Sequence, residues 1–362
     1  MRTFIRDNTI YIYILLFLIV SYLGIYNSSI YSSKENLYYK QIIWYIIGLS
    51  LIYIIKRINI KKIYNFSLYL YIINLLLLIG LIPFGTSING SRSWYSFLGI
   101  SFQPSEFMKI SLLLLNSNII DYFYKKKDKI SRIQEFKMIL SLFIVLLIPS
   151  IITFLEPDTG AVIGYLIITI SMLYISNINK IWFTLLSIII TTFLILFFLI
   201  YFNNQDLFIS IFGSSFFYRI DRIINWKTKS GMQLNNSLIA IGSSGFIQNR
   251  KVPLYFPEAQ TDFIFTSFES SYGLLGGIIL ILIIFTFDIY FLNQIKKEPN
   301  KHNKYVLFGI ISLFLYQQIQ SIAMTIGLLP ITGITLPLIS YGGTSVISYL
   351  ILVGLYLNIR KI

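Results

Sequence analysis

The sequence predicts an all-α polytopic membrane protein with about ten transmembrane helices, in a single domain that spans residues 1–362. Composition is the first indication, because 56% of the residues are hydrophobic and only 12% are charged. That is about half the charged share of an ordinary soluble domain. The second is length, because apolar segments such as 181–202 and 274–287 can cross hydrocarbon alone or with their flanks. The third is an alternation of loops rich and poor in Lys and Arg.

Hydropathy divides the chain into ten spans, and one long outer loop at about 204–262 separates the seventh from the eighth. The first span follows Arg2 and Arg6 without a small-x-small cleavage site, so we interpret it as a retained span and not as a removed signal peptide. The expected spans are 10–26, 41–55, 63–83, 105–122, 138–155, 161–176, 181–203, 263–294, 305–328 and 340–358.

The basic residues predict the orientation of these spans. Most of the 29 Lys and Arg residues fall in loops on one side, together with both termini, and this bias places the termini in the cytoplasm. Four segments look least like ordinary loops, and all four then fall on the outer face: 84–104, 155–160, 204–262 and 329–345. A chemical site built from them would face the periplasm or the cell exterior.

The counts of cysteine and histidine and the net charge argue against several classes of function. The chain has no cysteine, which excludes disulfides and thiolate chemistry. Its one histidine, His302, argues against a His-based metal cluster and a Ser-His triad. The net charge of +14 is poor support for nucleic-acid binding, because abundant Ile, Asn and Lys indicate an AT-rich genome. We therefore expect no nucleic-acid partner.

The stretch before the fourth span carries the first candidate site residues. Arg92 and Trp94 follow a turn-forming Asn-Gly pair, and Pro104 suits the first position of a helix. Glu106 then lies in the first turn, where the helix dipole favours its charge. Lys109 is three residues further and can pair with Glu106 inside the membrane. The structural alternative is an interfacial Trp anchor with a purely structural ion pair.

Two further outer segments contain unusual turns. In the sequence EPDTG at 156–160, Asp158 can cap the next helix and Gly160 relieves crowding, which is also a sufficient structural explanation. The segment 327–345 is dense in Pro and Gly, and irregular backbone at membrane depth must be buried in protein or line a wet cavity. It contains three candidate residues, Ser340, Gly342 and Gly343, of which the glycines could present amides to a ligand or permit tight helix packing.

The long outer loop supplies candidate cations and carboxylates. Arg219 and Arg222 could clamp a phosphate, although two loop arginines are weak support alone. Near the start of the eighth span lie Glu258, Asp262 and Glu269. Seven residues apart, Asp262 and Glu269 are expected on one helix, facing the same way. Desolvation would raise the pKa of Asp262 and suit it to act as a general base; the alternative is a buried carboxylate that holds helices together.

Five stretches carry a resemblance to a known family. These are GSRSWYSFLGISFQPSEFMK, EPDTG, NSLIAIGSSG, PEAQTDFIF and GLLPITGITLPLISYGGTS. Their order and their common face resemble the SEDS proteins of shape, elongation, division and sporulation, over nearly the whole chain. The Arg-Ser-Trp run, QPSE and PDTG are more similar to the elongation member RodA than to the division member FtsW.

The resemblance implies a peptidoglycan glycosyltransferase that polymerises lipid II into β-1,4 glycan strands for cell-wall elongation and rod shape. It would act at the outer face of the bacterial cytoplasmic membrane. The family's essential aspartate falls on Asp262, and its Glu and Lys fall on Glu106 and Lys109. The family's Arg-Trp pair falls on Ser93-Trp94, so the nearest charge, Arg92, stands one residue early.

This chain departs from the family pattern around the aspartate. The histidine two residues before it is Gln260, and paired glutamates after it are replaced by Ser270 and Ser271. The frequent Asn before the final loop corresponds to Ser321, and the loop at 246–256 is shortened. None of these changes removes the expected base, but they alter the donor and acceptor contacts of the loop.

The resemblance also implies a mechanism and partners. Asp262 would take the proton of the lipid II GlcNAc 4-hydroxyl as this oxygen attacks the MurNAc anomeric carbon of an undecaprenyl-pyrophosphate-linked glycan, with inversion. Cations must meet the departing pyrophosphate, and the candidates are Arg92, Lys109, Arg219 and Arg222, with a divalent cation (Mg or Mn) as a further aid. The expected protein partners are a class B penicillin-binding protein and membrane proteins of the elongation complex.

Three alternatives stand beside this expectation. One is a division member like FtsW with the same chemistry. Another is a lipid II flippase or transporter that forms no bond; such a protein should carry polar groups on both sides of the membrane midplane, whereas the motifs here gather on the outer face. The last is a scaffold for a cell-wall complex, which leaves Asp262 without a purpose.

Overall fold

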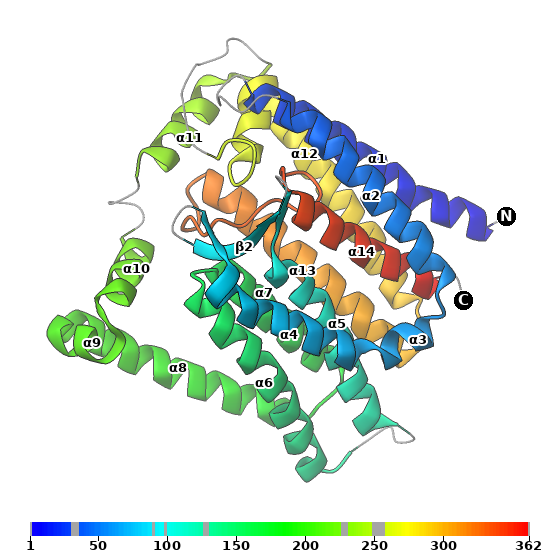
Figure 1. Cartoon of the computed structure of the whole chain (residues 1–362), viewed down its shortest axis with the longest axis vertical. Coiled ribbons are helices and arrows are strands. Elements are labelled where there is room, and N and C mark those ends of the chain that lie inside the picture. Colours follow the sequence, from blue (N-terminus) through cyan, green and yellow to red (C-terminus); the bar gives the residue numbers. More distant parts are fainter. Residues whose placement is uncertain are drawn as a thin grey trace.

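The computed structural model describes residues 2–29, 36–88, 91–97, 100–125, 130–225, 231–247 and 258–360. Helices dominate this part of the chain, and one small sheet accompanies them (Figure 1). The helices are α1 (Arg2–Ser28), α2 (Leu37–Arg57), α3 (Ile60–Asn65), α4 (Ser67–Phe84), α5 (Pro104–Tyr124), α6 (Arg132–Leu155), α7 (Thr159–Ile175), α8 (Lys180–Asn203), α9 (Gln205–Phe212), α10 (Ser214–Ile224), α11 (Met232–Ser243), α12 (Ile264–Lys296), α13 (Lys301–Thr325) and α14 (Gly343–Arg360); the strands are β1 (Thr86–Ile88), β2 (Ser91–Phe97) and β3 (Ile100–Phe102).

Nine of the ten predicted spans fall on one helix each: α1, α2, α5 to α8, and α12 to α14. The span predicted at 63–83 begins in α3 and continues along α4. Eight helices in the described part are long and apolar enough to cross a membrane. Two helices that match predicted spans do not meet this criterion. Helix α7 is apolar but has only 17 residues, and α5 carries the charges of Glu106, Lys109 and Asp121. The prediction of an all-α polytopic membrane protein is confirmed.

Two predicted loops contain regular structure. The segment 84–104 forms an antiparallel sheet in the order β1-β2-β3, with Thr86 opposite Trp94 and Tyr95 opposite Phe102. The Tyr95 hydroxyl donates to the Leu77 carbonyl of α4 at 2.7 Å, which fixes the sheet on the end of that helix. The segment 204–262 contains α9, α10 and α11. Hydropathy alone separates spans from loops and does not reveal such short elements.

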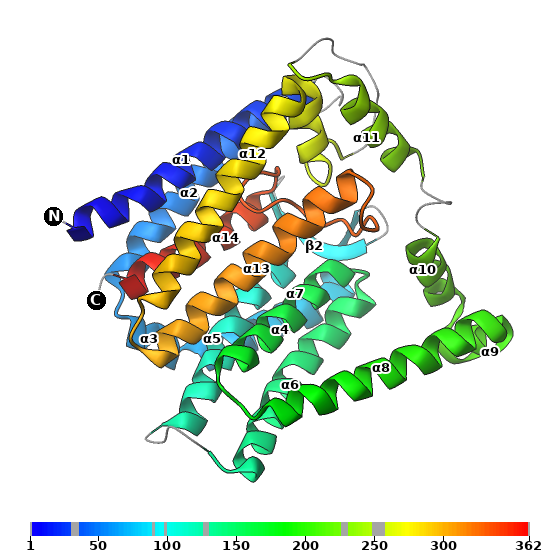
Figure 2. The same ribbon diagram turned by 180° about the vertical axis from the view of Figure 1, so that it is seen from behind.

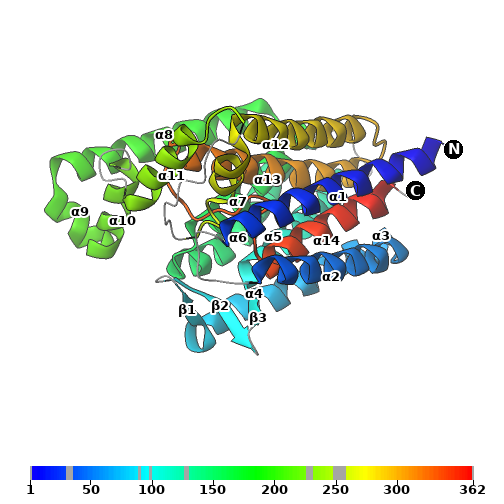
Figure 3. The same cartoon turned by 90° about the horizontal axis from the view of Figure 1, so that it is seen from above.

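The elements divide between the two ends of a helix bundle. Both chain termini and α3 lie at one end, whereas the sheet and α9 to α11 lie at the other (Figure 3). Near the centre, α14 packs along α2, and α13 packs along α7. Polar side chains join helices inside the bundle, as amide and hydroxyl groups do between membrane helices. The pairs are Asn74–Ser111 at 2.6 Å, Asn116–Thr169 at 3.0 Å and Asp288–Gln318 at 2.9 Å.

Helix α8 diverges from this bundle (Figure 2). All of its residues are described, and only Tyr201 is buried. At its first turn the Trp182 indole donates to the Glu135 carboxylate of α6 at 2.8 Å. At its far end Tyr201 stacks on Phe217 of α10. The helix is therefore attached at its ends, and its apolar middle is available to lipid.

Helix α12 is broken once. Gly273 has φ 72° and ψ −178°, a positive-φ conformation that glycine adopts at little cost. This non-helical residue separates residues 264–272 of α12 from residues 274–296. The second part alone has enough residues to cross a bilayer, which requires about 20. The first part is therefore available to build the outer end of the bundle.

Candidate active site at the outer end of the bundle

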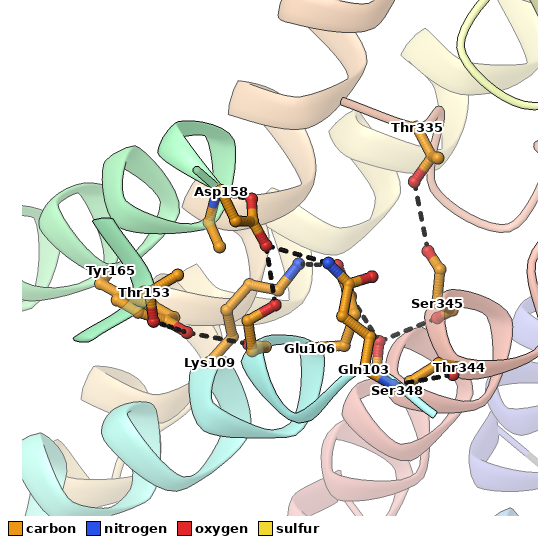
Figure 4. A network of polar contacts seen from close by, with 12 residues as sticks. Gln103, Glu106, Lys109, Thr153, Asp158, Tyr165, Thr335, Thr344, Ser345 and Ser348 are labelled. Atoms are coloured by element: carbon orange, nitrogen blue, oxygen red, sulfur yellow. Dashed lines mark hydrogen bonds and ion pairs between the residues drawn. The ribbon is translucent and has the colours of Figure 1, made fainter. Parts of the chain in front are cut away.

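The first turns of α5 hold a buried ion pair (Figure 4). Pro104 occupies the start of the helix, as predicted, because its missing N–H is not needed there. The Lys109 ammonium lies 2.7 Å from Glu106 Oε1, and Lys109 is only 1% exposed. The second oxygen of Glu106 accepts a hydrogen bond from the Ser348 hydroxyl of α14 at 3.0 Å. The predicted pairing of these two side chains is confirmed, and their function stays a prediction.

The turn between α6 and α7 meets the same end of α5. Asp158 Oδ1 accepts from the Ala161 N–H at 3.1 Å, so Asp158 caps α7 as expected. Its other oxygen accepts from the Gln103 amide and the Ser105 hydroxyl, both at 2.9 Å. Burial raises the pKa of Asp158, and its hydrogen bonds partly oppose that rise. A Cβ on Gly160 would stand 2.7 Å from Ile334 Cγ1, which confirms that this glycine relieves crowding.

Strand β2 lies over this turn. The buried Ser93 hydroxyl donates to the Glu156 carbonyl at 2.9 Å. Burial and the nearby Asp158 raise the pKa of the Glu156 side chain to about 8. Trp94 is half-buried in the sheet, and Arg92 is exposed and donates to the Ile82 carbonyl at the end of α4, 3.2 Å away. Arg92 is thus directed toward α4, and its contact with pyrophosphate stays a prediction.

Asp262 lies in a turn ahead of α12 and not on the helix. The Thr261 and Phe263 N–H groups donate to the Glu258 carbonyl at 3.1 and 3.2 Å, and the helix begins only at Ile264. The prediction that Asp262 and Glu269 share one helical face was therefore wrong, because helical spacing does not extend across a turn. Glu269 is buried on α12 and accepts from the Ser244 hydroxyl at 2.9 Å.

The surroundings of Asp262 favour its protonated form. Burial is the larger cause and the negative charge of Glu258 the second, and together they raise the pKa of Asp262 to about 7. The neighbouring Thr261 side chain acts in the opposite direction. A Cβ on Gly333 would lie 3.6 Å from Asp262 Oδ2, so the segment between α13 and α14 passes directly beside the carboxylate.

Hydrogen bonds fix that segment against the Asp262 turn. The Ser340 hydroxyl donates to the Thr261 carbonyl at 2.7 Å, and the Tyr341 N–H donates to the Gln260 carbonyl at 2.8 Å. From α2, the Gln41 amide donates to the Ser340 carbonyl at 3.1 Å. Sequence reasoning selected Ser340 but missed Gln41, whose only signal was a glutamine at the start of an apolar span. Gln260 contributes its backbone here, which does not depend on its side chain.

The same segment reaches the ion pair of α5. Its Thr335 hydroxyl lies 3.3 Å from the Ser345 hydroxyl of α14, one helical turn before Ser348. Ile334 contacts the position of Gly160, as described above. The segment between α13 and α14 therefore stands between Asp262 on one side and Asp158 with Glu106–Lys109 on the other.

The remaining candidates take different places. A Cβ on Gly343 would stand 2.6 Å from the Trp44 ring, whereas one on Gly342 would meet only Ser345 at 3.6 Å. Glu258 accepts from the Thr261 hydroxyl at 2.9 Å. Arg219 and Arg222 belong to α10, which lies away from the bundle in Figure 1, and their side chains are outside the described part. Most of the shortened loop at 246–256 is also outside it.

A divalent cation has no assigned ligands in this structure. Among the described residues, no three His, Cys, Asp or Glu side chains gather closely enough to hold a metal ion. The site therefore presents Asp262 as a general-base candidate, the buried Lys109 ammonium with its Glu106 carboxylate, and the half-buried Asp158 carboxylate at the turn before α7.

Comparisons with known proteins cover almost the whole chain. A family model for the cell cycle proteins FtsW, RodA and SpoVE matches residues 3–362. The peptidoglycan glycosyltransferase MrdB of Helicobacter pylori strain J99 is 31% identical over 364 residues, covering 96% of this chain and 88% of that protein. The probable peptidoglycan glycosyltransferase FtsW of Coxiella burnetii is 29% identical over 333 residues, covering 88% and 85%.

A solved structure has a similar fold. It belongs to a study of the structural coordination of polymerization and crosslinking by a peptidoglycan synthase complex. The two chains superpose with a TM-score of 0.77 at 23% identity, and the match covers 96% of each.

Proposed function

The chain belongs to the family of cell cycle proteins FtsW, RodA and SpoVE, and we propose that it is a peptidoglycan glycosyltransferase that joins lipid II units into β-1,4 glycan strands. The observation that carries this proposal is the half-buried Asp262 carboxylate, whose pKa is raised to about 7, beside the segment that also contacts the turn of Asp158. A base with a pKa near the working pH combines the correct protonation state with an effective proton transfer. The two relatives, a peptidoglycan glycosyltransferase and a probable one, support this reaction class.

In the proposed reaction Asp262 accepts the proton of the GlcNAc 4-hydroxyl while its oxygen forms a bond to the MurNAc anomeric carbon. The bond between that carbon and the pyrophosphate oxygen breaks, and the pyrophosphate leaves with the electron pair. Attack from the opposite face inverts the α-linked carbon to a β linkage. Charge gathers on the leaving group, so a fixed cation lowers the barrier most when it is shielded from water. Lys109 is such a cation, and Glu106 holds it in place.

The membrane setting suits substrates that carry lipid tails. The site lies at the end of helices that cross the bilayer, so a sugar can reach Asp262 while its undecaprenyl chain stays in hydrocarbon. The exposed apolar length of α8 leaves one side of the bundle open to lipid. With the basic end in the cytoplasm, we propose that the site faces the periplasm or exterior side of the bacterial cytoplasmic membrane.

We further propose a crosslinking partner, a class B penicillin-binding protein. The support is the similar solved chain, whose study concerns polymerization and crosslinking in one complex. The elongation role, with its other membrane proteins, rests on the RodA-like motifs QPSE and PDTG. A division role like that of FtsW would use the same chemistry.

A lipid II flippase without bond formation is the rival function. The polar pairs at Asn74, Asn116 and Asp288 each join neighbouring helices and are used in hydrogen bonds between them. Such pairing is typical of contacts that hold membrane helices together. The candidate site at the outer end, with its base and buried cation, favours the enzyme.

A gel assay of lipid II polymerisation by the purified full chain tests the proposal. We expect Asp262→Asn to lower the rate at least about 100-fold, because the amide cannot take the proton. Asp206→Asn, which removes one exposed carboxylate from α9, is the matched control and should retain the parent rate. Both variants are assayed with and without the cognate penicillin-binding protein. Polymerisation by Asp262→Asn at the parent rate contradicts the assignment.

A further inference from the structure

A second hollow lies at the opposite end of the bundle. It is a cavity of about 1050 Å³ near α3 and the C-terminal end of α14. Its walls come from α3, α5, α14 and the turn between α12 and α13, and the ionisable residues among its lining are Lys61, Asp121, Lys125, Lys297, Glu298, His302 and Arg360, together with Tyr64 and Tyr122. None of these residues contributes to the site around Asp262.

The helices that build the first site also end at this pocket. Helix α5 begins near Glu106 and ends beside Lys125, and α14 begins at Gly343 and ends at Arg360. The 18 residues of α14 correspond to about 27 Å of helix. This is close to the thickness of the hydrocarbon core, so the pocket lies at headgroup depth on the basic side.

Two of the charges in the pocket compensate each other. The Arg360 guanidinium lies 3.2 Å from the Glu298 carboxylate, and both side chains are nearly buried. Asp121 lies 3.6 Å from His302 Nδ1, and because His302 carries charge only when protonated, Asp121 keeps one negative charge in the lining. Three lysines remain, Lys61, Lys125 and Lys297, whose side chains are exposed and make no ion pair within the described part of the chain. The pocket therefore carries an excess of positive charge.

One wall of the pocket is rigid before any ligand binds. The His302 ring stacks on Tyr64 with 3.9 Å between centroids, and its Nε2 lies 3.1 Å from the Ser117 hydroxyl. The Tyr64 hydroxyl donates to Asn303 Oδ1 at 2.8 Å. A wall fixed on both faces loses little conformational freedom when a ligand arrives.

We propose that this pocket binds a phosphate-bearing anion through Lys61, Lys125 and Lys297, with the Tyr64–His302 stack as its rigid wall. Basic pockets between membrane helices at headgroup depth suit acidic phospholipid headgroups. A soluble phosphate compound offers the same chemistry. This second site is independent of lipid II polymerisation, so its test is a binding measurement and not an activity.

The test compares matched charge variants of the purified full chain. Lys61→Gln with Lys297→Gln removes two lining charges, and Lys137→Gln with Lys180→Gln removes two exposed lysines outside the lining. Native mass spectrometry measures retention of phosphatidylglycerol against phosphatidylcholine, and equilibrium dialysis of lipid-free protein measures radiolabelled inorganic phosphate. We expect the lining variant to bind the anion about 30-fold more weakly, since each basic residue near the surface contributes about fivefold, and the control to match the parent.

A third variant should change anion binding in the opposite direction. Asp121→Asn removes a negative charge from the lining and should strengthen anion binding about fivefold. Selective retention of phosphatidylglycerol would identify the ligand as a lipid headgroup, and binding of inorganic phosphate would identify a soluble phosphate compound. Either result supports the proposal when the Lys61→Gln, Lys297→Gln variant reduces the binding. Equal retention of the two lipids without phosphate binding, or equal losses in lining and control variants, overturns the proposal.

Discussion

At the scale of single residues, Asp262 has its proton affinity set by two neighbours with opposing effects. Glu258 adds negative charge and raises the pKa of Asp262, whereas the polar side chain of Thr261 lowers it. Burial is the largest effect and acts with Glu258. In the proposed reaction Asp262 must be deprotonated, so these neighbours would determine the pH at which polymerisation begins.

We therefore expect the rate of lipid II polymerisation to rise with pH through about 7, the raised pKa of Asp262. Glu258→Gln removes the negative charge that raises this pKa, so the midpoint should move to lower pH. The measurement is the initial rate between about pH 5 and about pH 9 for parent and variant. An unchanged midpoint in Glu258→Gln would show that Asp262 does not control the profile.

The buried ion pair makes a separate prediction about stability. Glu106→Gln leaves the Lys109 ammonium buried without its carboxylate, which should cost about 3–5 kcal/mol of unfolding free energy. Glu106→Gln with Lys109→Met removes both charges and should recover most of that loss. Thermal unfolding in detergent measures both variants.

The double variant also separates structure from chemistry. If Lys109 meets the pyrophosphate, the recovered fold stays poorly active in the lipid II assay. Parent-level polymerisation by the double variant would reduce the pair to a structural contact.

At the scale of elements, the spacing of residues in the sequence correctly predicted the features that depend on contacts between near neighbours in the chain. Pro104 at the start of α5, the Asp158 cap of α7 and the Glu106–Lys109 pair each depend on residues within four positions of one another. The contact of Gln41 with Ser340 joins residues 299 positions apart, and no local pattern contains it. The turn that removes Asp262 from α12 was not predicted either. Local hydrogen bonds to the Glu258 carbonyl form it, and the contact of the distant Ser340 with the Thr261 carbonyl holds it in place.

Two adjacent glycines test how α14 packs. A Cβ at Gly343 would overlap the Trp44 ring of α2 at 2.6 Å, so Gly343→Ala should lower the unfolding free energy by about 1–3 kcal/mol. Gly342→Ala is the matched control, because its Cβ meets only an ordinary contact at 3.6 Å. Thermal unfolding of the two variants provides the comparison, and equal midpoints would show that α14 can move away from α2 without cost.

At the scale of the whole molecule, composition predicted a polytopic helical membrane protein, and eight helices in the described part of the chain are long and apolar enough to cross a membrane. The distribution of Lys and Arg predicted that the unusual loop segments share one face of the molecule. The small sheet and helices α9 to α11 were not predicted, because amphiphilic segments at an interface have no long apolar run. The arrangement of the helices around the segment before α14 also depends on packing between distant parts of the sequence.

The cellular prediction concerns shape. Depletion of the protein should make rod-shaped cells round up, because side-wall synthesis stops while division continues. A plasmid copy of the parent should restore rods, and Asp262→Asn, produced at the same level, should not. Filaments that fail to divide would assign the chain to division in place of elongation.

The exposure of α8 also determines how its sequence can change over generations. Since only Tyr201 is buried, most exchanges among Ile, Leu and Val along α8 leave the packing of the bundle unchanged, and selection acts mainly on the mean hydropathy of the helix. In α14 most side chains are buried, and each exchange must be accommodated by neighbours. Lineages that share this fold should therefore diverge fastest along α8 while its mean hydropathy stays constant, and slowest along α14.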